Sequence, residues 1–514
     1  MSRAPSARRA AAPAASVPAL LKAGRRVASG GDWPRARLTA ELWARLYQGL
    51  SEGGIELVAL WGEAGFVHLA ARDQEGTAIF SLACPEGAYP SLGRVHTPAI
   101  RLERALRDLV GLRPEGLPDE RPWLDHGRWT ASAPLADVAA PRAPATYAFL
   151  PVEGEGLHEI PVGPVHAGII EPGHFRFTAN GETIARLEAR LGYTHKGTAA
   201  LMRGAPVERA GKLAGRISGD STVAYAYAFA LAVERALGIE APRRAQWLRA
   251  LMAELERIAN HLGDIGAVCN DAAFSMLHAH CGMLREQVLR GCQKAFGHRL
   301  MMDRIVPGGA AEDVRAGGLE AIAALLATLR RQFPGLVEIY DETNSLQDRV
   351  VGTGTVRPDW AQRFATGGFV GRASGRAFDA RKAQPYELYR ELAFDMPVLA
   401  EGDINARVWI RIREVEQSLA LVERLLAEPM PGAWRIDLPR PPKPSEGAAL
   451  VEAFRGDVFL WVRLDAGGAV EACLFRDPSW FQWPLLEAAI EGAIVGDFPL
   501  CNKSFNCSYS GHDG

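Results

Sequence analysis

The sequence predicts an α+β protein in which a small N-terminal α+β domain precedes a mainly α-helical bundle with peripheral β-hairpins. Three observations lead to this prediction. Before residue 130, short runs of β-branched and aromatic residues accompany one amphipathic helical pattern. A Pro/Gly-rich stretch follows, and afterwards apolar residues recur at three- and four-residue steps over long segments. This change of periodicity along the chain indicates two domains joined by a linker.

Residues 1–35 are predicted to be a flexible tail. The segment is rich in Ala, Pro and Arg, and no acidic residue precedes Asp32. This composition superficially resembles a transit peptide, which is the alternative interpretation. The segment has no long apolar stretch, so it is not a secretory signal.

Residues 36–130 are predicted to form the compact α+β domain. Ala40–Tyr47 has the pattern of an amphipathic helix, and Ile55–Trp61 and Thr77–Leu82 have the pattern of short strands. Residues 131–162 contain many prolines and glycines, which do not sustain a long helix. We therefore expect a linker or extended arm there.

The second domain is predicted to span residues 163–514, with helices at its centre. Apolar residues recur at helical spacing in Arg243–Leu262 and again in Val408–Leu426, so both segments are predicted to be helices on a common core. Asp457–Arg463 and Ala469–Leu474 flank a turn with two glycines and predict a β-hairpin.

The bulk composition is that of a globular protein. The chain has 514 residues, of which 48% are hydrophobic and 23% charged, and its net charge of −2 argues against nucleic acid as a partner. No apolar run reaches the roughly 18 residues that span a bilayer, so we expect membrane contact only through a partner.

The seven cysteines suit a reducing cytosol. They are scattered and form no Cys-x-x-Cys pair, which fits neither a disulfide framework nor an iron–sulfur or zinc site. Most are predicted to be small core residues. Cys501 and Cys507 have metal binding as a less favoured alternative.

A series of motifs occurs in the order seen in one protein family. They are Gly163–His166 with Glu171–Arg176, Gly192–Gly197, Arg216–Ser221, Ala232–Arg235, Glu254–His261, Pro307–Gly309, Ala373–Gly375, Gly402–Asp403 and Ser504–Gly511. Through them, residues from about 160 to 514 resemble the 49 kDa (D-type) subunit of NADH-quinone oxidoreductase, complex I, and the large subunits of group 4 [NiFe]-hydrogenases.

The first domain resembles the 30 kDa (C-type) subunit of complex I, through Glu103-Arg104, Asp108, Gly111 and Pro118-Asp119. A C-type unit followed by a D-type unit is the arrangement of formate-hydrogenlyase-type large subunits. Chains with this architecture that lack the ligand cysteines are similar to the energy-converting hydrogenase-related complexes.

The resemblance also shows where metal ligands are missing. Ser218 and Ser221 occupy the cysteine positions of Arg-x-Cys-Gly-x-Cys, and Ser508 and Gly511 occupy those of the C-terminal cysteine pair. Neither a serine hydroxyl nor glycine replaces a thiolate at neutral pH. The resemblance thus implies that no nickel-iron centre is present, and a hydrogenase with unusual ligands is the alternative.

In complex I, the vacated metal site belongs to a cavity for the quinone headgroup, approached by a histidine of the N-terminal loop and by a tyrosine. The resemblance makes His166 and His174 the loop histidines. The position of the tyrosine falls on Gly219, so Tyr225 or Tyr509 is the candidate that donates to the quinone oxygen. A packing role is the alternative for both tyrosines.

Two carboxylates are further candidates for proton transfer. Asp271 matches a family aspartate that partners the loop histidine, and a carboxylate beside an imidazole fixes its tautomer and raises its pKa. Asp220 introduces a carboxylate into the former metal loop. An ordinary solvent-exposed role is the alternative for each.

Charged residues on or near apolar helices predict a structural ion-pair network, because unpaired buried charges are costly. They are Glu234, Arg257, His261, Arg372 and Arg411. The alternative is a charge path that links the cavity to membrane partners.

The sequence indicates no further cofactor site. His278 and His280 alone are a weak metal signal, and surface or core roles are favoured. The glycines at 352–354 and 367–371 lack the strand-to-helix context of a dinucleotide fingerprint, so any NAD(H) is expected on a partner subunit.

The resemblance implies a large subunit of a membrane-associated oxidoreductase complex. We expect it to pass electrons from a small iron–sulfur subunit to a quinone-like acceptor, without a NiFe centre. The expected location is cytoplasmic and peripheral on the inner face of the cell membrane, beside antiporter-like integral membrane subunits. The alternative function is a non-catalytic scaffold in an ion-translocating complex.

Overall fold

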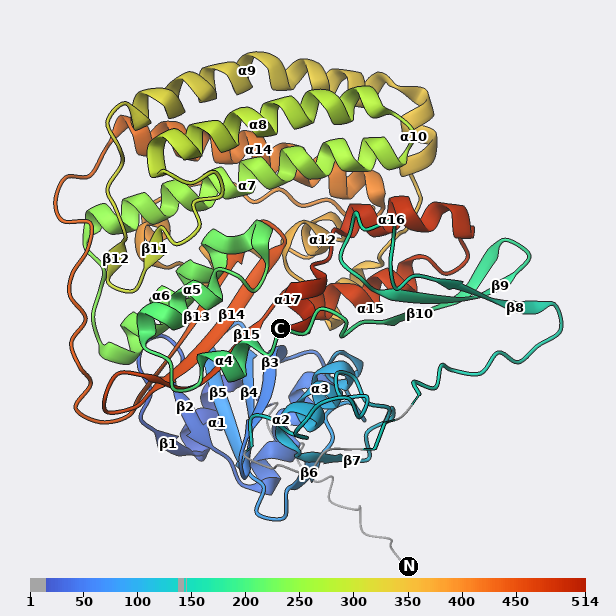
Figure 1. Cartoon of the computed structure of the whole chain (residues 1–514). Helices are drawn as coiled ribbons and strands as arrows, with labels where there is room; N and C mark the ends of the chain where they lie inside the picture. The colour runs from blue at the N-terminus through green and yellow to red at the C-terminus, as the bar shows by residue number, and fades with distance from the viewer. Residues whose placement is uncertain (1–14, 137–142, 145) are drawn as a thin grey trace, which may run out of the picture.

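The computed structural model describes residues 15–136, 143–144 and 146–514, and it confirms the α+β class. Figure 1 shows three layers: the N-terminal module at the bottom, a sheet near the C-terminus in the middle, and long helices at the top. The C-terminal helix α17 (Tyr509–Asp513) lies near the centre of the molecule.

The N-terminal module is built on a five-stranded sheet in the order β1-β2-β5-β4-β3. The pairing is antiparallel except between β2 and β5. The strands are β1 Arg25–Val27, β2 Arg35–Arg37, β3 Glu56–Glu63, β4 Phe66–Arg72 and β5 Thr77–Ala83. The module also holds α1 Val17–Ala23, α2 Ala40–Ser51 and α3 Ile100–Val110, and the short pair β6 Ala88–Pro90 and β7 Arg113–Glu115.

The predicted helix and strands of this module are found, with longer bounds. The helix α2 begins after Thr39, whose hydroxyl accepts the N–H of Leu42, and it buries Trp43, Leu46 and Leu50 at helical spacing. The strand interiors are buried on both faces, because helices cover one face of the sheet and a second sheet covers the other.

The structure differs from the predicted flexible tail at residues 1–35. Residues 1–14 lie outside the described residues. From Val17 the chain forms α1, whose Leu20 and Leu21 are buried in the main core, and then β1 and β2. The apolar residues of this Ala/Pro/Arg-rich segment thus pack on the core, and the composition of the segment does not predict that contact.

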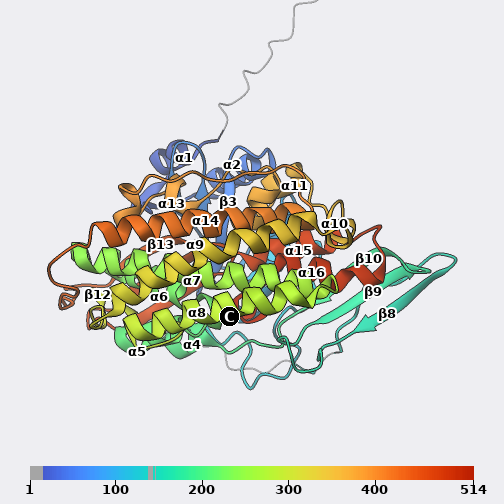
Figure 2. The ribbon, with the colours of Figure 1, turned by 90° about the horizontal axis from the view of Figure 1, so that it is seen from above.

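The segment predicted as a linker ends in regular structure. Residues 137–142 and 145 of this stretch lie outside the described residues, and β8 (Leu157–Val162) pairs with β9 (His174–Asn180), which pairs with β10 (Thr183–Arg190). This three-stranded sheet projects from the side of the molecule, as Figure 2 shows from above.

The remainder of the chain is mainly helical. The helices are α4 Thr198–Met202, α5 Val207–Ala214, α6 Thr222–Leu237, α7 Arg243–Asp271, α8 Ser275–Phe296, α9 Gly318–Glu342, α10 Asn344–Val350, α11 Pro358–Arg363, α12 Gly368–Ala373, α13 Ala380–Ala383, α14 Ile404–Ala427, α15 Ser479–Ala489, α16 Phe498–Phe505 and α17. Two short strands, β11 Ile305–Val306 and β12 Gly309–Ala310, form a small ladder. The predicted helices correspond to α7, which extends further, and α14, and both pack in the upper layer with α8 and α9 (Figure 1).

The predicted hairpin near the C-terminus is present, but it is central rather than peripheral. It consists of β14 (Gly456–Leu464) and β15 (Val470–Arg476), and β13 (Ser445–Ala453) pairs with β14 on the other side. The helix α6, apolar around its circumference, packs on β13 and β14. Phe459 and Trp461 join Trp33 and Trp61 of the N-terminal module in one buried cluster.

Within the described ranges, none of the helices combines the length and apolar character required to cross a membrane.

Candidate functional site

One pocket brings together three residues that the sequence predicts for the site. His166, Asp271 and Tyr509 line a space of about 360 Å³ between the loop after β8, the end of α7 and the start of α17. The rest of the wall is mainly apolar, and its other members are Val162, Ile169, Ile170, Phe175, Phe498, Pro499, Asn502, Lys503, Asn506 and Cys507. We call this space the loop pocket.

The imidazole of His166 is fixed by its own loop. Its Nε2 lies 2.8 Å from the carbonyl oxygen of Gly173, and since a carbonyl only accepts, Nε2 carries the hydrogen. Gly163 adopts φ +85°, and a Cβ there would lie 2.7 Å from this nitrogen. The loop therefore requires glycine, and Nδ1 is the ring nitrogen left for a second contact.

Asp271 and Tyr509 supply the acidic and phenolic groups of the loop pocket. Burial raises the pKa of Asp271, while the charge of Lys503 lowers it in part. Burial also raises the pKa of Tyr509, so its hydroxyl stays protonated at neutral pH. Its ring lies edge-on to Trp483 with centroids 5.0 Å apart.

His174 and Tyr225 lie outside this pocket, which differs from the prediction. His174 is buried in β9 with Nδ1 3.3 Å from the Gly163 carbonyl oxygen, so it supports the base of the loop. Tyr225 is fully buried in α6 and donates its hydroxyl to Asp477 at 2.6 Å. Both side chains therefore form hydrogen bonds within the fold rather than in the pocket.

The four residues that the motif resemblance aligns with the family's cysteines lie close together. The hydroxyl oxygens of Ser218 and Ser508 lie 2.8 Å apart although 290 residues separate them. Ser218 also donates to Asp220 at 2.9 Å, and Asp220 forms an ion pair with Arg455. Burial would raise the pKa of Asp220, but the charge and hydrogen bonds of Arg455 hold it below its usual value.

A carboxylate occupies the space of the fourth missing thiolate. A Cβ added at Gly511 would lie 2.7 Å from Cγ of Asp477 and 2.8 Å from Oγ of Ser508. Asp477 is held there by Tyr225 and by the backbone N–H of Ser479 at 2.8 Å. Glycine is therefore needed at position 511 for steric reasons.

These residues do not fit a nickel-iron centre. Three serine hydroxyls and a glycine stand at the four positions where thiolates would be needed, and an aspartate–arginine ion pair and a second carboxylate lie beside them. Across the ranges that the structure describes, His, Cys, Asp and Glu side chains form no group of three or more suited to a metal ion. Burial raises the pKa of the Cys501 thiol to about 11, so it is not a ready thiolate donor.

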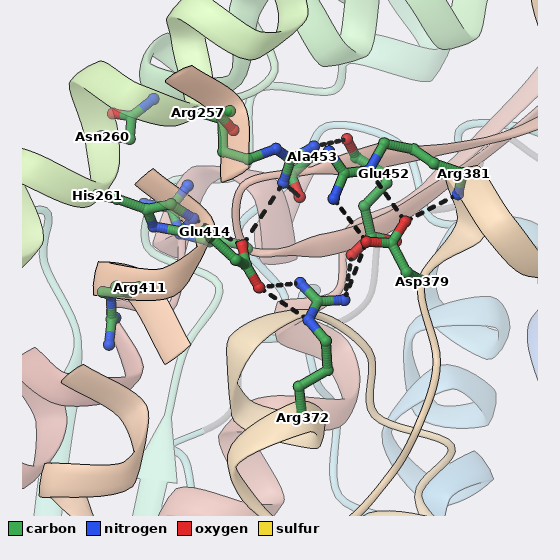
Figure 3. Close-up of polar contacts among 12 residues, drawn as sticks. Arg257, Asn260, His261, Arg372, Asp379, Arg381, Arg411, Glu414, Glu452 and Ala453 are labelled. Atoms are coloured by element: carbon green, nitrogen blue, oxygen red, sulfur yellow. Dashed lines mark hydrogen bonds and ion pairs between the residues drawn. The ribbon is translucent and has the colours of Figure 1, made fainter. Parts of the chain in front are cut away.

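The charged residues of the long helices are paired with one another (Figure 3). Arg372 donates to Glu414 at 2.8 Å and to Glu452 at 2.8 Å. Glu414 also accepts from His261 at 2.8 Å. Arg257 donates to the Glu452 carbonyl at 2.7 Å. These contacts support the structural ion-pair interpretation.

The other two members of the predicted network are paired nearby. Glu234 binds Arg249, with Oε2 3.0 Å from Nη1. Arg411 donates to Asp264 at 3.1 Å, and Asn506 of the loop pocket donates to the other oxygen of Asp264 at 2.8 Å. The network thus reaches the pocket wall, and the alternative of a charge path stays a hypothesis.

Sequence reasoning missed Arg455, Asp477 and Lys503. Arg455 lies in the turn two residues after β13 and Asp477 directly follows β15, and a charged residue close after such a segment was the available signal. No pattern in the neighbouring sequence indicates that Arg455 contacts Asp220 or that Asp477 lies against Gly511. His278 and His280 lie exposed on α8.

Residues 271–441 match the family model described as "Respiratory-chain NADH dehydrogenase, 49 Kd subunit". Formate hydrogenlyase subunit 5 of Escherichia coli (strain K12) is 30% identical over 452 residues, covering 82% of this chain and 76% of the relative. The chain belongs to the complex I 49 kDa family. The family resemblance drawn from the motifs is confirmed.

Other proteins are similar over about two thirds of the chain. The D-type subunit of the NADH-quinone oxidoreductase of Desulfotalea psychrophila is 30% identical over 341 residues, covering 65% of this chain and 91% of the relative. A chain in the structure of the membrane-bound sulfane sulfur reductase, an archaeal respiratory membrane complex, matches with TM-score 0.67 and 27% identity, covering 71% of this chain and 100% of that chain. These relatives are thus all subunits of oxidoreductase complexes.

Proposed function

We propose that this chain is the large subunit of a membrane-associated respiratory oxidoreductase complex, in which it binds a quinone-like acceptor and holds no NiFe centre. Electrons come from an iron–sulfur cluster on a small partner subunit. The chain is peripheral, on the cytoplasmic face, and contacts antiporter-like membrane subunits. Any NAD(H) binds elsewhere in the complex.

The observation that carries this proposal is the composition of the loop pocket. Apolar side chains such as Ile170 and Phe498 suit the faces of a flat ring, and the polar groups of His166, Asp271 and Tyr509 suit its oxygens. A quinone takes up protons together with electrons, so a carboxyl group with a raised pKa in the same pocket as an imidazole is suitable chemistry.

Each side chain has a distinct role in this proposal. His166, held through Nε2–H, donates a second proton, carried on Nδ1, to one quinone oxygen. Asp271 holds a proton and replaces the one that His166 gives up. The hydroxyl of Tyr509 donates a hydrogen bond to a quinone oxygen.

The proposal that no NiFe centre forms is supported by the filled metal site. Arg455 and Asp220 form a charge pair beside Ser218, and Asp477 lies where a side chain at position 511 would be. Metal analysis of the complex purified from membranes is expected to find no stoichiometric nickel. Nickel at one atom per chain would overturn this part of the proposal.

The test of quinone reduction uses the same complex. Reduced methyl viologen supplies electrons, and a short-chain ubiquinone analogue accepts them. We expect His166→Ala and Asp271→Asn each to lower turnover about tenfold or more, because each removes a group in proton transfer. His174→Ala is the matched control, since this histidine lies outside the pocket.

Two results would contradict the redox role. Intact complex without turnover would favour the scaffold function instead. An equal loss of quinone turnover in His174→Ala and His166→Ala would show that both variants disturb the structure of the loop, and that His166 has no specific role towards the acceptor.

A further inference from the structure

Two adjoining cavities lie where the N-terminal module meets β15 and the C-terminal residues. They share no lining residue with the loop pocket. The inner cavity, which we call the chamber, is about 110 Å³, and α3 contributes Leu102, Ala105, Leu106 and Leu109 to its wall. The outer cavity, the vestibule, is about 420 Å³ and is lined by Arg35, Arg37, Phe66 and Arg463 among others.

The two cavities form one continuous site. Trp61, Gly62, Leu135, Ala199 and Cys473 line both of them. The chamber is mainly apolar, and its size approaches that of the apolar cavity of about 150 Å³ that takes up benzene in a well-studied enzyme. A compact hydrocarbon group therefore fits the inner end, whereas water would find few partners there.

The vestibule provides a cation for the polar end of a ligand. Arg35 is bound to Glu446 at 2.6 Å, and Arg463 is bound to Glu63 and, at 3.1 Å, to Glu471.

Arg37 differs from Arg35 and Arg463 in this respect. It is exposed, its guanidinium lies 4.7 Å from the centroid of the Phe66 ring, and among the described residues no carboxylate lies within ion-pair distance of it. The aromatic ring thus positions a guanidinium whose hydrogen bonds are available to an anion.

We propose that the chamber and vestibule bind an amphipathic monocarboxylate, a medium-chain fatty acid, with its carboxylate on Arg37 and its hydrocarbon chain in the chamber. Charge complementarity selects the head group, and the apolar wall formed by α3 selects the tail. The site joins the N-terminal module to β15, so occupancy stabilises the contact between them. This proposal is independent of the quinone function.

The test is calorimetric titration of the purified full chain with octanoate, below the concentration at which it forms micelles. Octan-1-ol lacks the charge and acetate lacks the tail, so both are expected to bind at least about tenfold more weakly than octanoate. Arg37→Gln is expected to weaken octanoate about tenfold. Arg25→Gln is its matched control. Arg25 is exposed and lies opposite Arg37 in the register of β1 and β2, but it lines neither cavity.

Two further variants test the position of the tail. Ala105→Leu fills the chamber and is expected to abolish octanoate binding, whereas Leu109→Ala enlarges it and is expected to favour decanoate over octanoate. Circular dichroism verifies that each variant is folded. Absence of octanoate binding to the wild-type chain would overturn the proposal. Octanol binding as tightly as octanoate, or Arg37→Gln binding like wild type, would also overturn it, because the cavity would then be an unselective apolar void.

Discussion

At the scale of single residues, the former metal positions are occupied by groups that bind one another. Ser218 meets Ser508, Asp220 meets Arg455, and Asp477 fills the space beside Gly511. Each of these polar groups has a hydrogen-bond or ion-pair partner, which is the condition for a polar cluster that is largely buried. The residues at the positions of the family's cysteines therefore form a hydrogen-bonded polar cluster.

Gly511→Ala is expected to destabilise the protein by about 1–3 kcal/mol, because the new methyl group would overlap with the Asp477 carboxylate. Denaturant unfolding monitored by circular dichroism measures the change. Gly219→Ala is the control, since a Cβ there meets nothing within 4 Å. Equal stability of the two variants would show that Asp477 moves aside freely.

Glu256 predicts a pH dependence of stability. Burial raises its pKa to about 8, although the backbone N–H groups of Val223 and Ala224 lower it in part. In the unfolded chain its pKa is about 4.3. The folded state thus holds a proton that unfolding releases, so this contribution is complete below about pH 4.3 and is lost as pH rises towards 8.

Glu256→Gln is expected to remove this component. Thermal unfolding of wild type and variant at several values between pH 5 and 9 measures it, and the stability of the variant should fall less as pH rises. The same slope in both proteins would be evidence against a protonated Glu256.

At the scale of elements, the long helices are joined by ion pairs in addition to apolar packing. Arg372 of α12 connects Glu414 of α14 with Glu452 of β13, and His261 of α7 shares Glu414 (Figure 3). Burial would lower the pKa of Arg372, but the neighbouring carboxylates raise it, so the guanidinium stays charged. Such a network fixes the relative positions of elements whose apolar faces alone allow several registers.

Arg372→Met is expected to cost about 3–5 kcal/mol, because it removes the only arginine that donates hydrogen bonds to the side-chain carboxylates of both Glu414 and Glu452 among the described residues. Arg357→Met removes an exposed pair with Asp359 and is expected to change stability little. Denaturant unfolding of both variants measures the difference. A similar loss of unfolding free energy in Arg372→Met and Arg357→Met would contradict the stabilising role of the buried network.

At the scale of the whole molecule, the N-terminal module and the sheet β13–β15 share a core. Trp33 packs edge-on against Phe459 with centroids 4.9 Å apart, and Trp61 lies 5.5 Å from Trp461. Two segments far apart in sequence therefore bury one apolar surface. We expect the module and the sheet to unfold together.

Phe459→Ala is expected to cost about 3–5 kcal/mol and to expose both sides of this shared core. Hydrogen exchange followed by mass spectrometry is expected to show β4 and β14 losing protection in parallel. Trp434→Ala, at a side chain that is 42% exposed, is the control. Loss of protection in β14 alone would mean that the module is stable independently.

The sequence by itself determined the helices α7 and α14, the hairpin β14–β15 and the family, and through the family resemblance it predicted the four altered ligand positions. These features depend on periodicity and on short motifs, which are local in the chain. It also proposed His166, Asp271 and Tyr509, through resemblance to the family.

Only the tertiary structure decided which candidates share a pocket. It placed Tyr225 on Asp477 and His174 at the base of the loop, and it brought Arg455 to Asp220 across 235 residues. It also buried the hairpin at the centre of the molecule. Periodicity specifies that a face is buried but not which distant segment covers it, because that choice depends on packing between elements that have no local signal in common.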